Sequence, residues 1–144
     1  MFKLPKIVAP EISIKGNFSL DNNGQFYSTT KVYGYIKKNN CPFSYEFLLG
    51  LLNSNLFWFF IKNTGYILRG GYFTFKTNYV FPFPIPDING IDDLCVSKIE
   101  NIVKDIHVIR QHQGNSADVS KELKQIDKLL LKIYNISEYQ EIIN

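Results

Sequence analysis

The 144-residue sequence lacks an apolar stretch long enough to cross a membrane. Its longest apolar run covers only residues 56–61, whereas a transmembrane helix requires roughly 20 apolar residues. The first residues are basic and aromatic, and they do not have the layout of a secretory signal peptide. We therefore expect a soluble, cytoplasmic protein.

Cysteine and histidine are scarce, and their spacing predicts neither a metal site nor a catalytic centre. Cys41 and Cys95 are isolated and have no zinc-site spacing, so we expect two free thiols. His107 and His112 are five residues apart on a predicted helix and point to different faces, which argues against a zinc pair. No Ser-His-Asp or Cys-His arrangement stands out.

One nuclease-like pattern is present. Pro86-Asp87, followed by Glu122-Leu123-Lys124, fits the Pro-Asp…Glu-x-Lys signature of metal-dependent nucleases. In such a site a strand aligns both carboxylates on Mg²⁺. Glu122 and Lys124 fall instead on a predicted amphipathic helix, so we interpret the match as accidental.

Charge and aromatic content divide the chain near Pro86. Residues 1–86 carry nine basic and three acidic side chains, a net charge of +6, while residues 87–144 carry seven basic and ten acidic side chains, a net charge of −3. Twenty of the 22 aromatic residues and all six prolines also lie in the first part. This excess suggests attraction to a polyanion. On charge alone, an ordinary basic surface of a soluble protein explains it equally well.

The first part reads as short strands and helices. Residues 6–35 favour strands, and Asn23-Gly24 predicts a hairpin in which a strand ending near Leu20 returns from near Gln25. Ser44 and Ser54 are predicted N-caps of two helices, with Gly65 ending the second. The apolar run 56–61, which includes Trp58, could be imagined as a stacking platform for bases, but helical spacing of this kind indicates core.

The following segments predict a strand, an extended segment that leaves the sheet, and two helices. Alternation over residues 72–77 places Phe73 and Phe75 on one face and Tyr72, Thr74 and Lys76 on the other. Three prolines make residues 81–86 an extended segment leading out of the sheet. Apolar spacing then predicts two antiparallel helices, the first ending near residues 112–115 and the second running to Ile133, with Asn135 as its C-cap and a terminal turn opened by Ser137 and Gln140. We therefore expect an α+β fold, with a twisted, mainly antiparallel sheet packed on short helices and followed by a C-terminal antiparallel helical pair.

Five segments, taken together and in this order, resemble a known family. They are residues 6–13 (KIVAPEIS), 45–62, which contain LLGLLNS, 69–76 (RGGYFTFK), 81–86 (FPFPIP) and 125–138. The family is the TaqI-like C-terminal specificity domain of type IIG restriction enzymes and related adenine-N6 DNA methyltransferases.

The resemblance implies a DNA-reading domain that lies C-terminal to a methyltransferase domain, which transfers a methyl group from S-adenosylmethionine to adenine. In many relatives an endonuclease domain precedes both. This chain has no Pro-Pro, so it lacks the Asn-Pro-Pro-Tyr-type motif that holds a flipped base, and it also lacks the glycine-rich cofactor loop. We therefore expect no enzyme activity and no cofactor in this chain. S-adenosylmethionine and Mg²⁺ are expected only in catalytic domains outside it.

Within this resemblance, one group of residues is expected to contact DNA. Arg69 precedes two glycines that would let the backbone approach a phosphate, while its guanidinium could bind guanine or phosphate. The alternatives are a solvated loop arginine, an ordinary outer strand face and a solvated run of lysines. The expected strand and loop contacts are Arg69, Gly70, Gly71, Tyr72, Thr74, Lys76 and Asn78, with Lys31, Lys37 and Lys38 as phosphate binders.

The sequence thus predicts a sequence-specific DNA recognition domain of a type II, IIG-like restriction-modification enzyme. Residues 1–86 would form the basic, aromatic recognition core, and residues 87–144 a helical spacer and docking region within the same structural unit. The expected partners are double-stranded DNA and the methyltransferase and endonuclease domains of the same polypeptide or complex. The alternatives are a target recognition domain of a type I specificity subunit, and a protein-interaction module with an incidental basic face.

Overall fold

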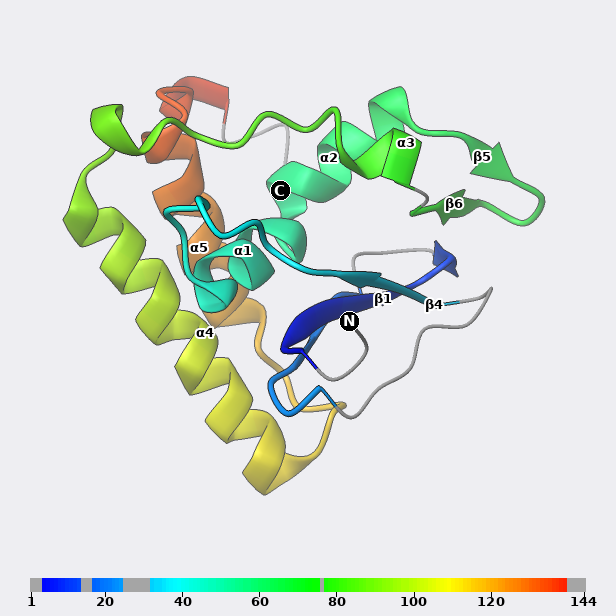
Figure 1. Cartoon of the computed structure of the whole chain (residues 1–144), viewed down its shortest axis with the longest axis horizontal. Coiled ribbons are helices and arrows are strands. Elements are labelled where there is room, and N and C mark those ends of the chain that lie inside the picture. Colours follow the sequence, from blue (N-terminus) through cyan, green and yellow to red (C-terminus); the bar gives the residue numbers. More distant parts are fainter. Residues whose placement is uncertain (1–3, 14–16, 25–31, 76, 140–144) are drawn as a thin grey trace.

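The computed structural model describes residues 4–13, 17–24, 32–75 and 77–139, and these residues form two small antiparallel sheets and several helices (Figure 1). Within these residues, each sheet has three strands. The first has the order β3 (Ser19–Asp21), β1 (Lys6–Pro10), β4 (Val32–Tyr35), and the second the order β2 (Ile12–Ser13), β6 (Tyr72–Thr74), β5 (Ile67–Leu68). The expected antiparallel strands are confirmed, but they divide into two sheets at Glu11, the single residue between β1 and β2.

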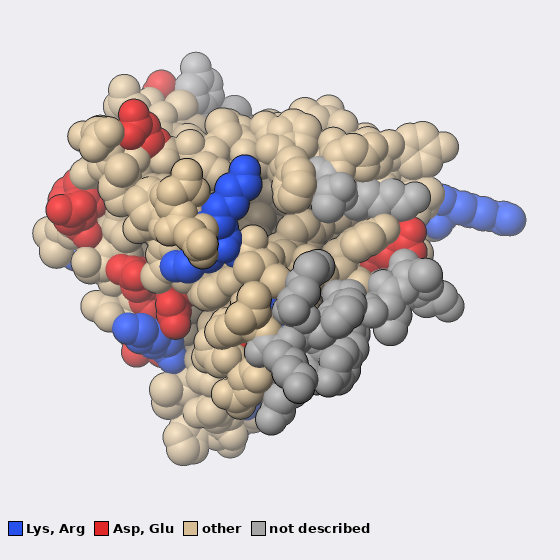
Figure 2. Space-filling view, viewed as in Figure 1, with Lys and Arg blue, Asp and Glu red and all other residues tan. Residues whose placement is uncertain are grey.

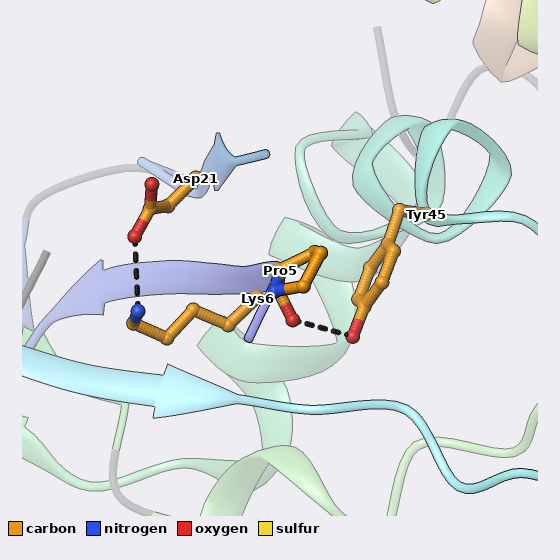
Figure 3. A network of polar contacts seen from close by, with 4 residues as sticks. All are labelled: Pro5, Lys6, Asp21 and Tyr45. Atoms are coloured by element: carbon orange, nitrogen blue, oxygen red, sulfur yellow. Dashed lines mark hydrogen bonds and ion pairs between the residues drawn. The ribbon is translucent and has the colours of Figure 1, made fainter. Parts of the chain in front are cut away.

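Strand β1 is the centre of the first sheet, and a buried ion pair joins it to β3. Lys6 lies directly opposite Asp21, and its Nζ is 2.9 Å from Asp21 Oδ2 although the lysine is only 2% exposed (Figure 3). A buried ammonium is tolerated only when a partner of opposite charge compensates its lost hydration. One of the nine basic residues counted in residues 1–86 therefore has a structural role.

The predicted hairpin after Leu20 is only partly within the described residues. Gly24 has a φ of 63°, the left-handed conformation expected at such a turn. The returning strand, expected from near Gln25, lies outside the described residues. Strand β4 pairs with β1 rather than with β3, so the order along the chain is not the order in the sheet.

Two helices begin and end where the sequence predicts. In α1 (Tyr45–Leu52), the Ser44 hydroxyl accepts a hydrogen bond from Phe47 N, and in α2 (Asn55–Thr64), Ser54 accepts one from Phe57 N, each at 3.1 Å. Gly65 is the C-cap of α2. The buried side chains on these helices form the centre of the core and include Phe47, Leu51, Phe57 and Ile61.

Trp58 belongs to this core rather than to a stacking platform. Its ring meets the edge of Phe73 with centroids 5.2 Å apart, and a second contact to Phe75 lies at 6.2 Å. Helix α2 thereby supports the inner face of the second sheet.

Helices α4 (Asp93–Gln113) and α5 (Ser120–Ile133) form the expected antiparallel pair (Figure 1). Asp92 caps α4, and Gly114 ends it with a φ of 89°. At the contact with α1, a Cβ added to Gly50 would lie 3.0 Å from the methyl groups of both Ile99 and Val103. The helical pair therefore shares one hydrophobic core with the strands and helices before it.

The predicted strand 72–77 is shorter than expected. Strand β6 ends at Thr74, and α3 (Thr77–Val80) begins three residues later. Phe73 and Phe75 are buried as expected, but Thr74 is also buried, at 4% exposure, so the expectation that Thr74 lies on the outward face of the strand is wrong. Thr74 pairs with Ile12 of β2, a tertiary contact that the local alternation does not encode.

The proline-rich segment 81–86 is not extended throughout, as was expected, because it begins with a turn at Phe81 and Pro82 in which Phe83 N donates a 3.1 Å hydrogen bond to Val80 O. It then passes α2 and leads to a 3-10 turn, η1 (Ile88–Gly90) (Figure 1). Phe83 anchors it, with its ring 5.0 Å from those of Phe57 and Phe60. Tyr134 donates a 2.6 Å hydrogen bond to Pro84 O and is itself the C-cap of α5, where Asn135 was expected. Asn135 follows with a φ of 57°, and η2 (Ser137–Tyr139) is the last described element. None of the helices in the described ranges is both long enough and apolar enough to span a membrane.

Candidate nucleic-acid interface

A three-residue loop at the tip of the β5–β6 hairpin places Arg69 at an exposed apex. Leu68 pairs with Tyr72 across the hairpin, and Gly71 N donates a 3.2 Å hydrogen bond to Leu68 O. Gly70 has a φ of 87° and Gly71 a φ of 81°. Residues with a Cβ rarely adopt these angles, and a turn with positive φ at its third residue strongly favours glycine there. The two glycines thus allow the sharp reversal that exposes Arg69.

Tyr72 is part of the same tip. It is 44% exposed, and its ring atoms would lie 3.3 and 3.4 Å from a Cβ on Gly70. The ring therefore lies across Gly70 and uses the space that a side chain would occupy. On the face shown in Figure 2, a basic side chain projects from the hairpin tip into solvent.

A groove of about 320 Å³ lies beside the hairpin. It is formed by β2, β5, β6 and α3 together with the residues next to them, and its lining residues are Glu11, Ile12, Tyr66, Leu68, Thr74, Asn78 and Tyr79. Thr74 lies opposite Ile12 in the register and is almost fully buried, whereas Asn78 is exposed. The structure thus brings Thr74 and Asn78, both predicted from sequence, into one concave site.

Hydrogen bonds to the backbone of Phe75 hold this groove in place. Phe75 N donates to Glu11 O at 2.7 Å, and Phe75 O accepts from the Tyr35 hydroxyl at 2.7 Å. Burial, together with the neighbouring Tyr33, raises the pKa of Tyr35 to about 12, so this phenol stays a donor even in moderately alkaline solution. The end of β6 and the start of α3 are therefore fixed relative to both sheets.

The second predicted basic site is the loop between β4 and α1. Lys37 Nζ donates to Phe43 O at 3.0 Å and lies 5.2 Å from the centre of the Tyr45 ring, while Lys38 is exposed. The Lys37 side chain is therefore held against the loop, whereas that of Lys38 is accessible to solvent. Lys31 and Lys76 lie outside the described residues.

Charge is distributed unevenly over the molecule. On the face shown in Figure 2, acidic side chains gather over η1 and the first half of α4, where basic side chains lie beside them, while over the β4–α1 loop and at the hairpin tip the projecting charged side chains are basic. Glu122 and Lys124 lie on α5, as expected, and not on a strand. Among the described residues, no three His, Cys, Asp or Glu side chains are grouped so that they could hold a metal ion.

Five of the seven groove residues were not predicted as site residues from the sequence, namely Glu11, Ile12, Tyr66, Leu68 and Tyr79. Glu11, Tyr66 and Tyr79 are far apart along the chain and meet only through the pairing of β2 with β6 and the position of α3. The only sequence signal near them is the Gly70-Gly71 turn, which marks the hairpin but not its neighbours.

The comparison with curated proteins gave no match. The family model of the TaqI-like C-terminal specificity domain matches residues 1–85, more than half of the chain, and this confirms the family expected from the sequence. The matched residues include the hairpin and all residues that line the groove, while α4 and α5 lie beyond them. Specificity domains of this family are non-catalytic and recognise the DNA target of restriction-modification enzymes. The chain therefore belongs to the TaqI-like C-terminal specificity domain family.

Proposed function

We propose that this chain is the sequence-reading domain of a type II restriction-modification enzyme of the IIG kind. In this proposal it positions DNA for adenine-N6 methylation by a methyltransferase domain outside the chain, and for cleavage where an endonuclease domain is present. S-adenosylmethionine and Mg²⁺ would bind only to those domains. The observation that carries the proposal is the exposed Arg69 tip beside the groove, both within the residues that the family model matches.

The hairpin and the β4–α1 loop have different roles in this proposal. Arg69 is exposed at the apex of the hairpin, where a guanidinium can make a bidentate contact with guanine or with a phosphate. Lys38 supplies sequence-independent attraction to the backbone. Base contacts near the groove then provide the specificity, because phosphate contacts fix position but carry no sequence information directly.

The C-terminal helices serve as a spacer and docking region. Residues 87–144 carry a net negative charge, which disfavours close approach to DNA. Their apolar faces share the core with residues 1–86, and the Ser44 hydroxyl donates a 2.5 Å hydrogen bond to Glu100 on α4. We infer that the two regions form one structural unit.

The two arginines of the chain offer a matched test. Fluorescence anisotropy with a labelled duplex would compare Arg69→Ala with Arg110→Ala, which removes an equivalent exposed charge near the end of α4. Loss of the Arg69 contact should weaken binding by about 1–3 kcal/mol, with Arg110→Ala close to wild type. Equal effects of the two substitutions would remove Arg69 from the interface.

A salt series of the same titration separates DNA recognition from the interaction-module alternative. Binding through phosphate contacts weakens steeply as salt rises, because counterions are released from DNA. Self-association that is insensitive to salt, without any anisotropy change on DNA, would instead support an interaction module.

A further inference from the structure

The groove beside the hairpin has a chemistry different from that of the tip. The tip offers a cation, whereas the groove offers the carboxylate of Glu11, the amide of Asn78 and two tyrosines, Tyr66 and Tyr79. Figure 2 shows acidic atoms between β2 and β6, beside the basic side chain that projects from the hairpin. A carboxylate has no hydrogen bond to give to a phosphate, so Glu11 suits the edge of a base better than the DNA backbone.

The major-groove edges of the bases differ in what they offer to a carboxylate. Adenine presents its N6 amino group and cytosine its N4 amino group, while guanine O6 and thymine O4 are acceptors. An ionised carboxylate accepts hydrogen bonds and cannot donate them. Glu11 would therefore favour adenine or cytosine and disfavour guanine or thymine at the same place.

The backbone around Glu11 is held firmly enough for such discrimination. Glu11 O accepts from Phe75 N at 2.7 Å, and the next residue, Ile12, pairs with Thr74 on β6. Asn78 lies on α3, three residues after Phe75, and lines the same groove from the other side. Tyr66 is 58% exposed, so the groove is open to a base edge from solvent.

The position of Arg69 agrees with this division of roles. Leu68 lines the groove and the next residue is the apex of the hairpin, so the cation stands at the rim of the site. A duplex held at the rim through its phosphates or a guanine would present a neighbouring base edge to the groove.

We propose that this groove reads one amino-bearing base, adenine or cytosine, with Glu11 as the hydrogen-bond acceptor and Asn78 as a second polar contact. The inference rests on the proposed function, since it names a specificity-determining site within it. It predicts that one position of the recognised sequence depends on Glu11, while overall attraction to DNA does not.

The test is selection of bound duplexes from a random library, followed by sequencing, with the 144-residue chain and its variants. Glu11→Met keeps the length of the side chain but removes both acceptor oxygens. We expect the wild type to enrich a motif, and Glu11→Met to lose about 5- to 20-fold of the preference for adenine or cytosine at one position. Its affinity for unselected duplex should be equal to or tighter than that of the wild type, because a negative charge is removed.

Two further variants complete the experiment. Glu138→Met makes the same change at an exposed glutamate outside the groove and should enrich the wild-type motif. Asn78→Ala should weaken preference at the same position or at the adjacent one. An unchanged motif in both Glu11→Met and Asn78→Ala, or a loss confined to guanine or thymine, would overturn the inference while leaving the proposed function intact. A wild type that enriches no motif would overturn the proposed function itself.

Discussion

Asn53 is expected to be one of the most sensitive polar residues of the fold. Its side-chain Oδ1 accepts a hydrogen bond from Phe18 N and its Nδ2 donates one to Phe18 O, both at 2.9 Å. The amide thus pairs with the backbone of Phe18 as a strand would. Phe18 is only 3% exposed, so water has limited access to the groups that Asn53→Ala would leave unpaired.

The magnitude follows from these two contacts. An unsatisfied buried backbone group costs about 1–3 kcal/mol, so Asn53→Ala should lower the free energy of unfolding by about 2–4 kcal/mol. In a domain of this size the melting temperature should fall by roughly 5–15 °C. Urea denaturation followed by the fluorescence of Trp58, the single tryptophan, measures the change.

Asn63→Ala is the matched control for this substitution. Asn63 is exposed, and its amide donates only to Phe59 O, one turn earlier in α2. Its removal should cost less than about 0.5 kcal/mol. If Asn53→Ala cost no more than Asn63→Ala, the reasoning about the Phe18 contacts would be refuted.

Two further substitutions, Gly50→Ala and Asp127→Asn, test contacts between the helices. Gly50→Ala should lower the urea midpoint by the equivalent of about 1 kcal/mol, because the added methyl meets stiff β-branched side chains of α4 at 3.0 Å and this outweighs the gain in helix propensity. Gly90→Ala, with open space around the new methyl, should be close to neutral, and similar losses for both would contradict the contact. Burial raises the pKa of Asp127 above its value in the unfolded chain, although hydrogen bonds from Asn55 oppose the shift. Protonation of Asp127 therefore stabilises the folded state. This stabilisation is fully present below the pKa of the unfolded chain and is lost as the pH rises through the pKa of the folded protein. Wild type should therefore gain stability relative to Asp127→Asn as the pH falls from 7 towards 4, and a pH-independent difference between their urea midpoints would exclude this linkage.

The helical parts of the fold were predictable because their signals are local. Ser44, Ser54 and Gly65 act within one turn of their own position, so their roles can be read from neighbouring residues. The roles of Asn53 and Asn55 were not predictable in this way. Their partners, Phe18 and Asp127, are 35 and 72 residues away, and no sequence period connects them.

The sheets and the groove were likewise hard to predict, because they depend on contacts between residues far apart in the sequence. The alternation of residues 72–77 correctly placed Phe73 and Phe75 in the core, but it could not show that Thr74, opposite Ile12 of β2, is buried as well. Of the candidate site, the sequence indicated the tip, because two adjacent glycines mark a special backbone conformation. It did not indicate Glu11, because a single glutamate between two short strands has no pattern of its own.

The central claim is that DNA contacts the β5–β6 hairpin and the adjacent groove, and not the C-terminal helices. Hydrogen–deuterium exchange of the chain with and without a saturating duplex tests this most directly. We predict slower exchange on DNA binding within residues 66–74 and 77–81, with no change over α4. Protection confined to α4, with the hairpin unchanged, would contradict the account.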